Sequence, residues 1–278
     1  MPFMNFQFNT ILIPVDFSVN TEVAIDKALK LCEPTDSTIY LFYVQRGRQL
    51  FHSNSDFSQS TIATRMDALA GQIKKSRPGI RVKAAVERDR NLESAIAMKA
   101  KSINASLIVI GKKSSHSWLP FLNSIVPSRL SELTHIPVLT VKPGAMDTDT
   151  KIVVVPIGAE IDASKFRIME ALCRKARIHI HLLAFLDSGI ESVDSQAGSF
   201  LNTFDWVKKN LNCPMKYAFV YGDNKAKALL KYCRSVDADL LLVRPVSETK
   251  MGWMNSHISD LIPANSRTQV LSVQSLNF

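Results

Sequence analysis

The sequence has few cysteines, and none of them form a CxxC pair. Four cysteines in 278 residues are too few for a disulfide framework, so we interpret them as reduced core thiols: Cys32, Cys173, Cys213 and Cys233. No apolar run approaches the roughly 18 residues that span a bilayer. No lysine or arginine precedes Lys27, so the basic start of a signal peptide is missing. We therefore expect a cytoplasmic protein.

The sequence also lacks the residue patterns that many enzymes use. It has no nucleophile elbow and no Ser-His-Asp or Cys-His arrangement, because each cysteine lies in or beside a predicted element without a recognisable base. His179 and His181 lie two apart on a predicted strand, a spacing that metal sites use, but no third ligand is evident nearby. A partly buried, hydrogen-bonded pair is the alternative interpretation. We expect neither an enzyme nor a metal site.

The composition is that of a globular chain with a basic excess. Hydrophobic residues make up 46% of the chain and charged residues 21%, which suits burial of a core and argues against disorder. The net charge of +9 divides into +7 for residues 1–146 and +2 for residues 147–278. Because the basic residues are dispersed, we do not expect nucleic acid as a partner.

An internal repeat organises the chain. Residues 91–111 recur in reduced form 133 positions later as residues 224–244, and the strand-like segments at 11–15 and 136–141 recur at 153–157 and 268–273. Two copies of roughly 140 residues are each the size of a single domain, whereas solenoid repeats are far shorter. We predict two domains, 1–146 and 147–278, joined by a polar, turn-rich linker at 143–150.

Short apolar runs alternate with helical periodicity in both copies. Apolar runs without interruption suit strands that are covered on both faces, and strict alternation with helices builds a parallel sheet. The predicted fold class is therefore α/β, with two tandem doubly wound domains, each a mainly parallel five-stranded sheet flanked by helices. The predicted strands lie near 8–15, 38–44, 80–86, 106–111, 137–142, 152–157, 178–185, 215–220, 239–244 and 269–274.

The predicted ligand position is the carboxyl edge of the first sheet, where the first and fourth strands end. Asp16 and Ser18 follow the first strand and suit either a ligand or a helix cap. Gly111 ends the fourth strand, and a loop leads to a helix that we expect to start at Ser124. A glycine before a helix N-terminus can present backbone N–H groups to a phosphate.

The sequence resembles the universal stress protein family over nearly all of both halves. The residues that carry the resemblance are 11–18, 105–111 and 136–142. ATP-binding members share a loop of Gly, two residues, Gly, nine residues, Gly, and Ser or Thr. The resemblance implies nucleotide contacts at these positions: Pro14, Val15, Asp16, Val44, Gly111, Ser114, Ser124 and Ile125.

This sequence departs from the ATP-binding pattern at most loop positions. Ser114, Ser124 and Ile125 replace two glycines and a hydroxyl, and glycines in such loops allow positive φ or close backbone approach. Lys112 and Lys113 could supply charge, but we expect them to be solvated. The second half departs further, with Gly158 in place of Asp16, Arg244 in place of Gly111 and Pro245 as the next residue, and we interpret it as structural.

Bulky apolar residues lie in the loops that follow the fourth strand of each copy. They stand at 118–122 in the first half and at 251–254 in the second. Two interpretations remain open. These side chains either cover the crevice or form an apolar patch for a partner.

Two functions follow from the resemblance. The first is a non-enzymatic stress-response protein of regulatory or protective kind, which acts through association with an unknown protein. Its two domains would form an internal pseudo-dimer through their last strands, residues 137–142 and 269–274, with a homodimer as a further option. The alternative is a sensor that binds ATP with Mg in its first domain, with at most slow hydrolysis.

Overall fold

The computed structural model describes residues 6–33, 35–45, 59–112, 125–158, 160–186, 193–221, 224–244 and 258–274. The first half contains, in chain order, β1 (Thr10–Pro14), α1 (Val19–Leu31), β2 (Thr38–Gln45), α2 (Gln59–Ser76), β3 (Arg81–Arg88), α3 (Leu92–Ser102), β4 (Leu107–Gly111), α4 (Pro127–Thr134) and β5 (Val138–Val141). The short helix η1 (Pro143–Ala145) follows in the linker, and the second half contains β6 (Ile152–Ile157), α5 (Ala163–Lys175), β7 (His179–Leu186), α6 (Val193–Asn210), β8 (Met215–Tyr221), α7 (Lys225–Ser235), β9 (Leu240–Val243), η2 (Ile258–Asp260) and β10 (Gln269–Ser272). The predicted alternation of strands and helices is confirmed.

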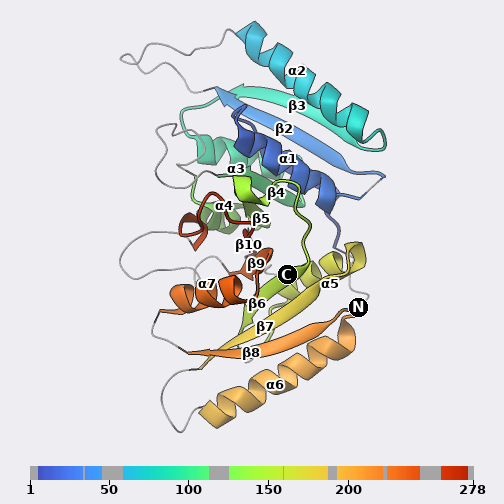
Figure 1. Cartoon of the computed structure of the whole chain (residues 1–278). Helices are drawn as coiled ribbons and strands as arrows, with labels where there is room; N and C mark the ends of the chain where they lie inside the picture. Colours follow the sequence, from blue (N-terminus) through green and yellow to red (C-terminus); the bar gives the residue numbers. More distant parts are fainter. Residues whose placement is uncertain are drawn as a thin grey trace.

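The strands form one sheet rather than two. Within the described residues its order is β3-β2-β1-β4-β5-β10-β9-β6-β7-β8. Each half has the same internal order, read outward from its last strand, and strands within a half run parallel. Figure 1 shows the first half above the second, with β5 and β10 meeting between them. The predicted fold class is confirmed, because each half contributes five parallel strands in the described part of the chain, and the two sets join into one 10-stranded sheet.

The junction is an antiparallel pairing of β5 with β10. Val138, Leu139 and Thr140 lie opposite Ser272, Leu271 and Val270, respectively. An edge strand left open exposes a row of unpaired N–H and C=O groups, and this pairing satisfies them for both halves at once. The contact predicted between the two last strands is present, and it is the reason that the two sheets become one.

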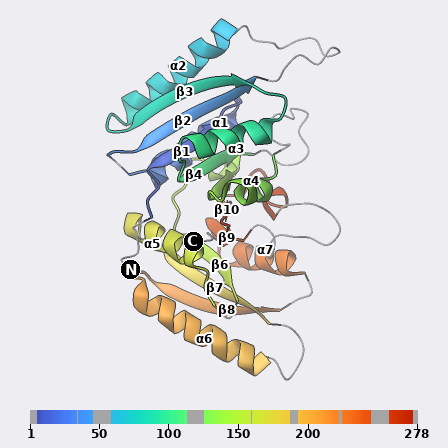
Figure 2. The ribbon, with the colours of Figure 1, turned by 180° about the vertical axis from the view of Figure 1, so that it is seen from behind.

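The two faces of the sheet are covered differently. One hydrophobic cluster runs through both halves beneath α1, α2, α5 and α6. On the opposite face, α3 and α4 cover one cluster in the first half, and α7 and η2 cover another in the second. Figure 2, seen from behind, shows α3 and α4 on the face opposite α1. The shared cluster ties the halves together on one face only.

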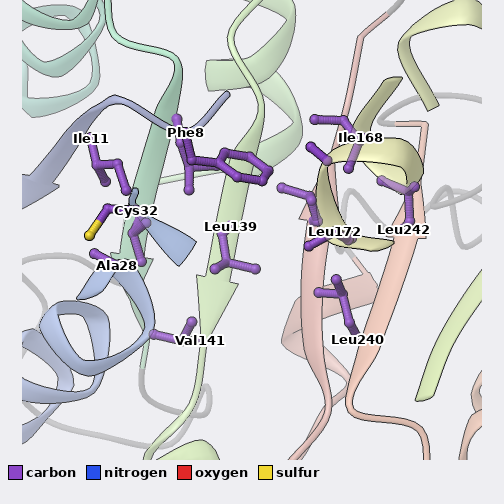
Figure 3. Close-up of a cluster of buried hydrophobic side chains, with 14 of the residues drawn as sticks. Phe8, Ile11, Ala28, Cys32, Leu139, Val141, Ile168, Leu172, Leu240 and Leu242 are labelled. Carbon is purple, nitrogen blue, oxygen red and sulfur yellow. The ribbon is translucent and has the colours of Figure 1, made fainter. Parts of the chain in front are cut away.

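Phe8 lies at the centre of the shared cluster. Its side chain is fully buried, and Figure 3 shows its ring pointing from the first half toward Leu172 of α5, above Leu139 of β5. An aromatic ring contributes a large buried area, so one side chain can fill the space between two layers of strands and helices. The hydrophobic core is therefore continuous across the junction.

The linker between the halves is anchored to both of them. Lys27 of α1 donates from Nζ to the carbonyl oxygen of Thr148 and, at 3.0 Å, to its Oγ1. Gly144 N donates to the carbonyl of Ala264 at 2.9 Å, and Ala145 is fully buried. Residues 143–150 include the short helix η1, so they are more ordered than a plain turn-rich linker.

The start of α4 differs from the prediction. We expected Ser124 as its cap, but the helix begins at Pro127 with Val126 as the N-cap residue. Proline suits the first helical position because its φ is already helical and the missing N–H has no partner there in any helix. Proline at 127 was the better signal for the helix start.

Candidate functional site

The predicted site lies where β1, β2 and β4 end. Pro14 and Val15 are buried, and the Val15 N–H donates to the carbonyl of Phe42 at 2.9 Å. Val44, near the end of β2, is 1% exposed. The structure thus brings these residues to one edge of the sheet, but their side chains belong to its core.

Asp16 is engaged by the start of its own helix. Its Oδ1 accepts from the Ser18 N–H at 3.0 Å, from Ser18 Oγ at 2.6 Å and from Thr21 Oγ1 at 2.7 Å. Ser18 is the N-cap of α1 and accepts from the Asn20 N–H at 3.2 Å. Of the two interpretations left open, the structure shows the helix cap, which satisfies N–H groups that have no partner inside the helix.

An aromatic stack that the sequence analysis missed lies beside Asp16. Phe17 has a φ of 57°, in the left-handed region that non-glycine residues seldom adopt. Its ring stacks on Tyr43 with centroids 5.3 Å apart, and the Arg65 guanidinium lies 4.3 Å from the Phe17 ring centroid. The strained backbone holds a cation–π stack at the edge of the sheet. No spacing pattern links these three residues.

Gly111 allows α1 to approach the end of β4. A Cβ atom at this position would overlap the backbone carbonyl and the Cβ of Asn20 in the first turn of α1. Glycine is required here because the helix backbone fills the space that a side chain would need. The one family glycine retained in the first half therefore has a packing role.

Asn20 is a further residue that the sequence analysis missed. It is 7% exposed, and its Nδ2 donates to Ser18 Oγ at 3.1 Å. Its Oδ1 is buried and has no hydrogen-bond partner among the described residues. A buried acceptor without a donor is costly, so this oxygen is a place where a ligand donor would be stabilised.

Lys112 is buried, which contradicts the expectation that it is solvated. Its Nζ donates to the Ile125 carbonyl at 3.0 Å and pairs with Asp260 Oδ1 at 2.7 Å. Asp260 belongs to η2 of the second half, so this ion pair crosses between the halves. Sequence reasoning missed it, because Ser128 stands at the matching position of the first copy and no pattern points to an acid.

A second lysine is buried close to Lys112. Lys142, which follows β5, is 2% exposed. Burial and, to a smaller extent, repulsion by Lys112 lower the pKa of Lys142 to about 8, against an opposing attraction by Asp260. Lys112, Lys142 and Asp260 therefore lie close together at the carboxyl edge of the sheet, with both lysines shielded from water.

The remaining predicted contacts divide between the core and undescribed residues. Ile125 is fully buried in the cluster under α3 and α4, so it replaces the expected hydroxyl with a core side chain. Ser114 and Ser124 lie outside the described residues. So do Lys113, Pro245 and the apolar loop residues at 118–122 and 251–254.

In the second half an ion pair occupies the matching edge. Arg244 follows β9, and its Nη2 pairs with Asp162 Oδ2. Asp162 is the N-cap of α5 and also accepts from the Ser164 N–H at 2.8 Å. Gly158 is exposed, and nothing lies within 4 Å of a Cβ built there. Arg244 thus ties the end of a strand to the start of a helix.

The two histidines of β7 have different environments. His179 is exposed, whereas His181 is 7% exposed and its Nδ1 lies 3.0 Å from the hydroxyl of Tyr232. Burial, with repulsion from Lys216 and His179, lowers the pKa of His181. No group of three or more histidine, cysteine or acidic side chains in the described part of the chain is placed to hold a metal ion.

A cleft of about 900 Å³ lies at the opposite, amino edge of the sheet. It is lined by the last turns of α1 and α5, the start of β3 and the linker, and basic side chains outnumber carboxylates there. Much of this charge is already paired, since Lys30 lies 3.3 Å from Asp26 and Lys175 lies 2.8 Å from Glu33. The cleft is remote from the candidate site.

No helix in the described residues has the length and apolar character needed to cross a membrane.

A search of curated proteins found no match. Several solved structures share the fold over most of the chain. A universal stress protein from Archaeoglobus fulgidus is 17% identical, with 98% of this chain and 100% of that one covered and a TM-score of 0.65.

Two further matches are not named as universal stress proteins. A functionally unknown protein from Pseudomonas aeruginosa is 14% identical, with 96% and 92% covered and a TM-score of 0.61. The cytoplasmic domain of a prokaryotic cation chloride cotransporter is 11% identical, with 96% and 95% covered and a TM-score of 0.57. Such likeness concerns the fold alone. Residues 7–142 match the model of the universal stress protein family, so the first half of the chain is a domain of that family.

Proposed function

We propose that the protein is a non-enzymatic stress-response protein that acts through association with another protein. The observation that carries this proposal is that key residues of the first-half site already make contacts within the folded chain. Asp16 is bonded within its own helix cap, Gly111 lies against Asn20, and Lys112 pairs with Asp260. Groups held this way would have to exchange existing contacts before they could bind a phosphate.

In this proposal the two halves form an internal pseudo-dimer. The antiparallel pairing of β5 with β10 and the shared hydrophobic cluster support it. A pair built within one chain needs no second copy to satisfy its last strands. The remaining surfaces of both halves are then available to a partner protein.

One observation favours adenine-nucleotide binding by the first half as a second candidate. The buried Asn20 Oδ1 lacks a donor among the described residues, and it lies beside Gly111 at the edge where a ligand is expected in this fold. A ribose hydroxyl or a water on Mg²⁺ would supply that donor.

Nucleotide release and thermal stability separate the two functions. The purified full chain is denatured and the supernatant is analysed for nucleotide, and the native chain is then melted with and without Mg-ATP. Ligand at 100 times Kd stabilises the folded state by about 2.7 kcal/mol. The association proposal expects no released nucleotide and no shift. A shift that Asn20→Ala removes, with Asn210→Ala as a surface control, would instead establish the nucleotide sensor.

A further inference from the structure

Two cysteines that are far apart in the sequence meet in the second half. Cys173 lies in the last turn of α5, and Cys213 lies between the end of α6 and the start of β8. Both residues line the same cavity, and each thiol is the largest influence on the pKa of the other. Both side chains are half-buried against the shared hydrophobic cluster, so the core fixes their position while the surface leaves them accessible.

The pair lines a cavity of its own. A hollow of about 300 Å³ is bounded by Cys173, Cys213 and three basic residues, Arg174, Lys175 and Arg177. This volume admits a small oxidant but is at the lower limit for larger ligands. Of the basic residues, Arg174 acts to lower the pKa of the Cys173 thiol, because a nearby positive charge stabilises a thiolate.

The interaction between the two thiols affects their pKa values in opposite directions. It lowers the pKa of Cys213, against an opposing effect of burial, and it raises the pKa of Cys173. Arg174 acts to lower the pKa of Cys173, and Glu170 acts to raise it. Cys213 is therefore the member of the pair that becomes the thiolate, with Cys173 as the partner that stabilises it.

The other two cysteines provide a contrast within the same chain. Cys32 is 5% exposed and Cys233 is 2% exposed. Burial raises the pKa of Cys32, and it raises the pKa of Cys233 to about 12. Structural cysteines of this kind are inert, whereas reactive ones sit in electropositive and partly exposed positions.

We propose that Cys173 and Cys213 form a dithiol site that hydrogen peroxide oxidises to a disulfide. The Cys213 thiolate attacks one peroxide oxygen, and the O–O bond breaks to leave a sulfenic acid and hydroxide, which takes a proton to become water. The Cys173 thiol then attacks that sulfur, forms the S–S bond and releases a second water. Two thiols lose two hydrogen atoms and the peroxide is reduced to two waters.

The reaction is tested on the full chain by mass spectrometry. Fully reduced protein is treated with limiting hydrogen peroxide, quenched with N-ethylmaleimide and digested. The expected result is a Cys173–Cys213 linked peptide, with Cys32 and Cys233 still alkylated as free thiols. Equal oxidation of all four cysteines, or oxidation without the linked peptide, would overturn the proposal.

Variants assign the two roles. Cys173→Ser removes the resolving thiol, so dimedone should trap a sulfenic acid on Cys213, whereas Cys213→Ser should abolish both products. The Cys32→Ser/Cys233→Ser variant should form the linked peptide as fast as the natural chain. Dimedone labelling confined to Cys32 or Cys233 in any variant would refute the assignment.

Alkylation of the natural protein tests the proposal without relying on variants that could misfold. Iodoacetamide at limiting concentration alkylates thiolates, and its rate at each cysteine is read from the natural folded protein by peptide mapping. Cys213 should react at least about tenfold faster than Cys32 or Cys233, as reactivity follows thiolate character and access. Similar rates at the three positions would contradict the proposal.

Discussion

At the scale of single residues, Gly111 has no side chain because α1 occupies the space beside it. Gly111→Ala places a methyl group against the Asn20 carbonyl. Such overpacking typically costs about 1–3 kcal/mol of unfolding free energy. Urea titration should therefore show a lower midpoint with an unchanged slope.

Gly71→Ala is the matched control for that substitution. Gly71 lies in α2, and nothing lies within 4 Å of a Cβ built there. Alanine in the interior of a helix is favoured over glycine by roughly 0.5–1 kcal/mol, so this variant should gain stability. A Gly111→Ala variant as stable as the natural chain would show that α1 is not packed against β4 as described.

Lys142 makes stability depend on pH. Its pKa is about 8 in the folded protein against 10.5 in the unfolded chain. Between these values the unfolded chain binds more protons, so the unfolding free energy rises as the pH increases from about 8 to 10.5. Below pH 8 the full penalty is present, on the order of 3 kcal/mol by the conversion of about 1.4 kcal/mol per pKa unit.

Lys142→Met tests this penalty. The variant should lose the rise in unfolding free energy between pH 8 and pH 10 that the natural chain shows, and near pH 7 it should be the more stable of the two. Denaturant titrations of both proteins at pH 7, 8.5 and 10 give the comparison. Parallel pH profiles would mean that the amine is charged throughout, as an ordinary solvated lysine is.

At the scale of elements, η2 is held to β4 by the ion pair of Lys112 with Asp260. Their side chains are 5% and 30% exposed. Asp260→Asn leaves a buried amine without its countercharge, and breaking such a pair typically costs about 3–5 kcal/mol. Lys112→Met/Asp260→Asn should cost less than the sum of the single changes, with a coupling of roughly 1–3 kcal/mol in urea titrations.

The exposed pair of Arg81 with Asp36 is the control for that cycle. Its side chains are 63% and 88% exposed, and its atoms lie 3.0 Å apart. Surface pairs contribute about 0–1 kcal/mol, so the same double-mutant cycle there should give little coupling. A coupling between Lys112 and Asp260 as small as that of the exposed pair would mean that they do not connect the halves.

The order of elements was predictable because it rests on local patterns. Apolar runs such as 107–110 carry their own signal, and that strand appears where the pattern placed it. The start of α4 was missed because the choice between Ser124 and Pro127 as the start depends on the neighbouring packing. Lys112 was misjudged because its partner lies 148 residues away, and no local pattern marks such a partner.

Part of the candidate site could likewise be read from the sequence. The edge of the sheet at Asp16 and Gly111 followed from the strand pattern and from the family resemblance. What those residues do there did not follow, because a carboxylate beside a helix start serves a ligand or a cap equally well. The stack of Phe17, Tyr43 and Arg65 depends on three separate elements meeting, which only the fold brings about.

At the scale of the whole molecule, the halves share both a sheet and a core. The repeat predicted two similar units, and their strand orders agree. The repeat did not predict that the halves join into one sheet. Edge strands pair through backbone hydrogen bonds, which require no side-chain pattern other than apolar residues. With Phe8 buried between the halves, we expect them to unfold together rather than one after the other.

Native-state hydrogen exchange across the sheet tests most directly the claim that the two halves are one folded unit. The account predicts that slow amides of β5 and β10 exchange with the same free energy as those of β1 and β6, since all of them would open only through global unfolding. Exchange from β5 and β10 at a clearly lower free energy, while β1 and β6 stay protected, would contradict it and would mean that the halves separate in the native state.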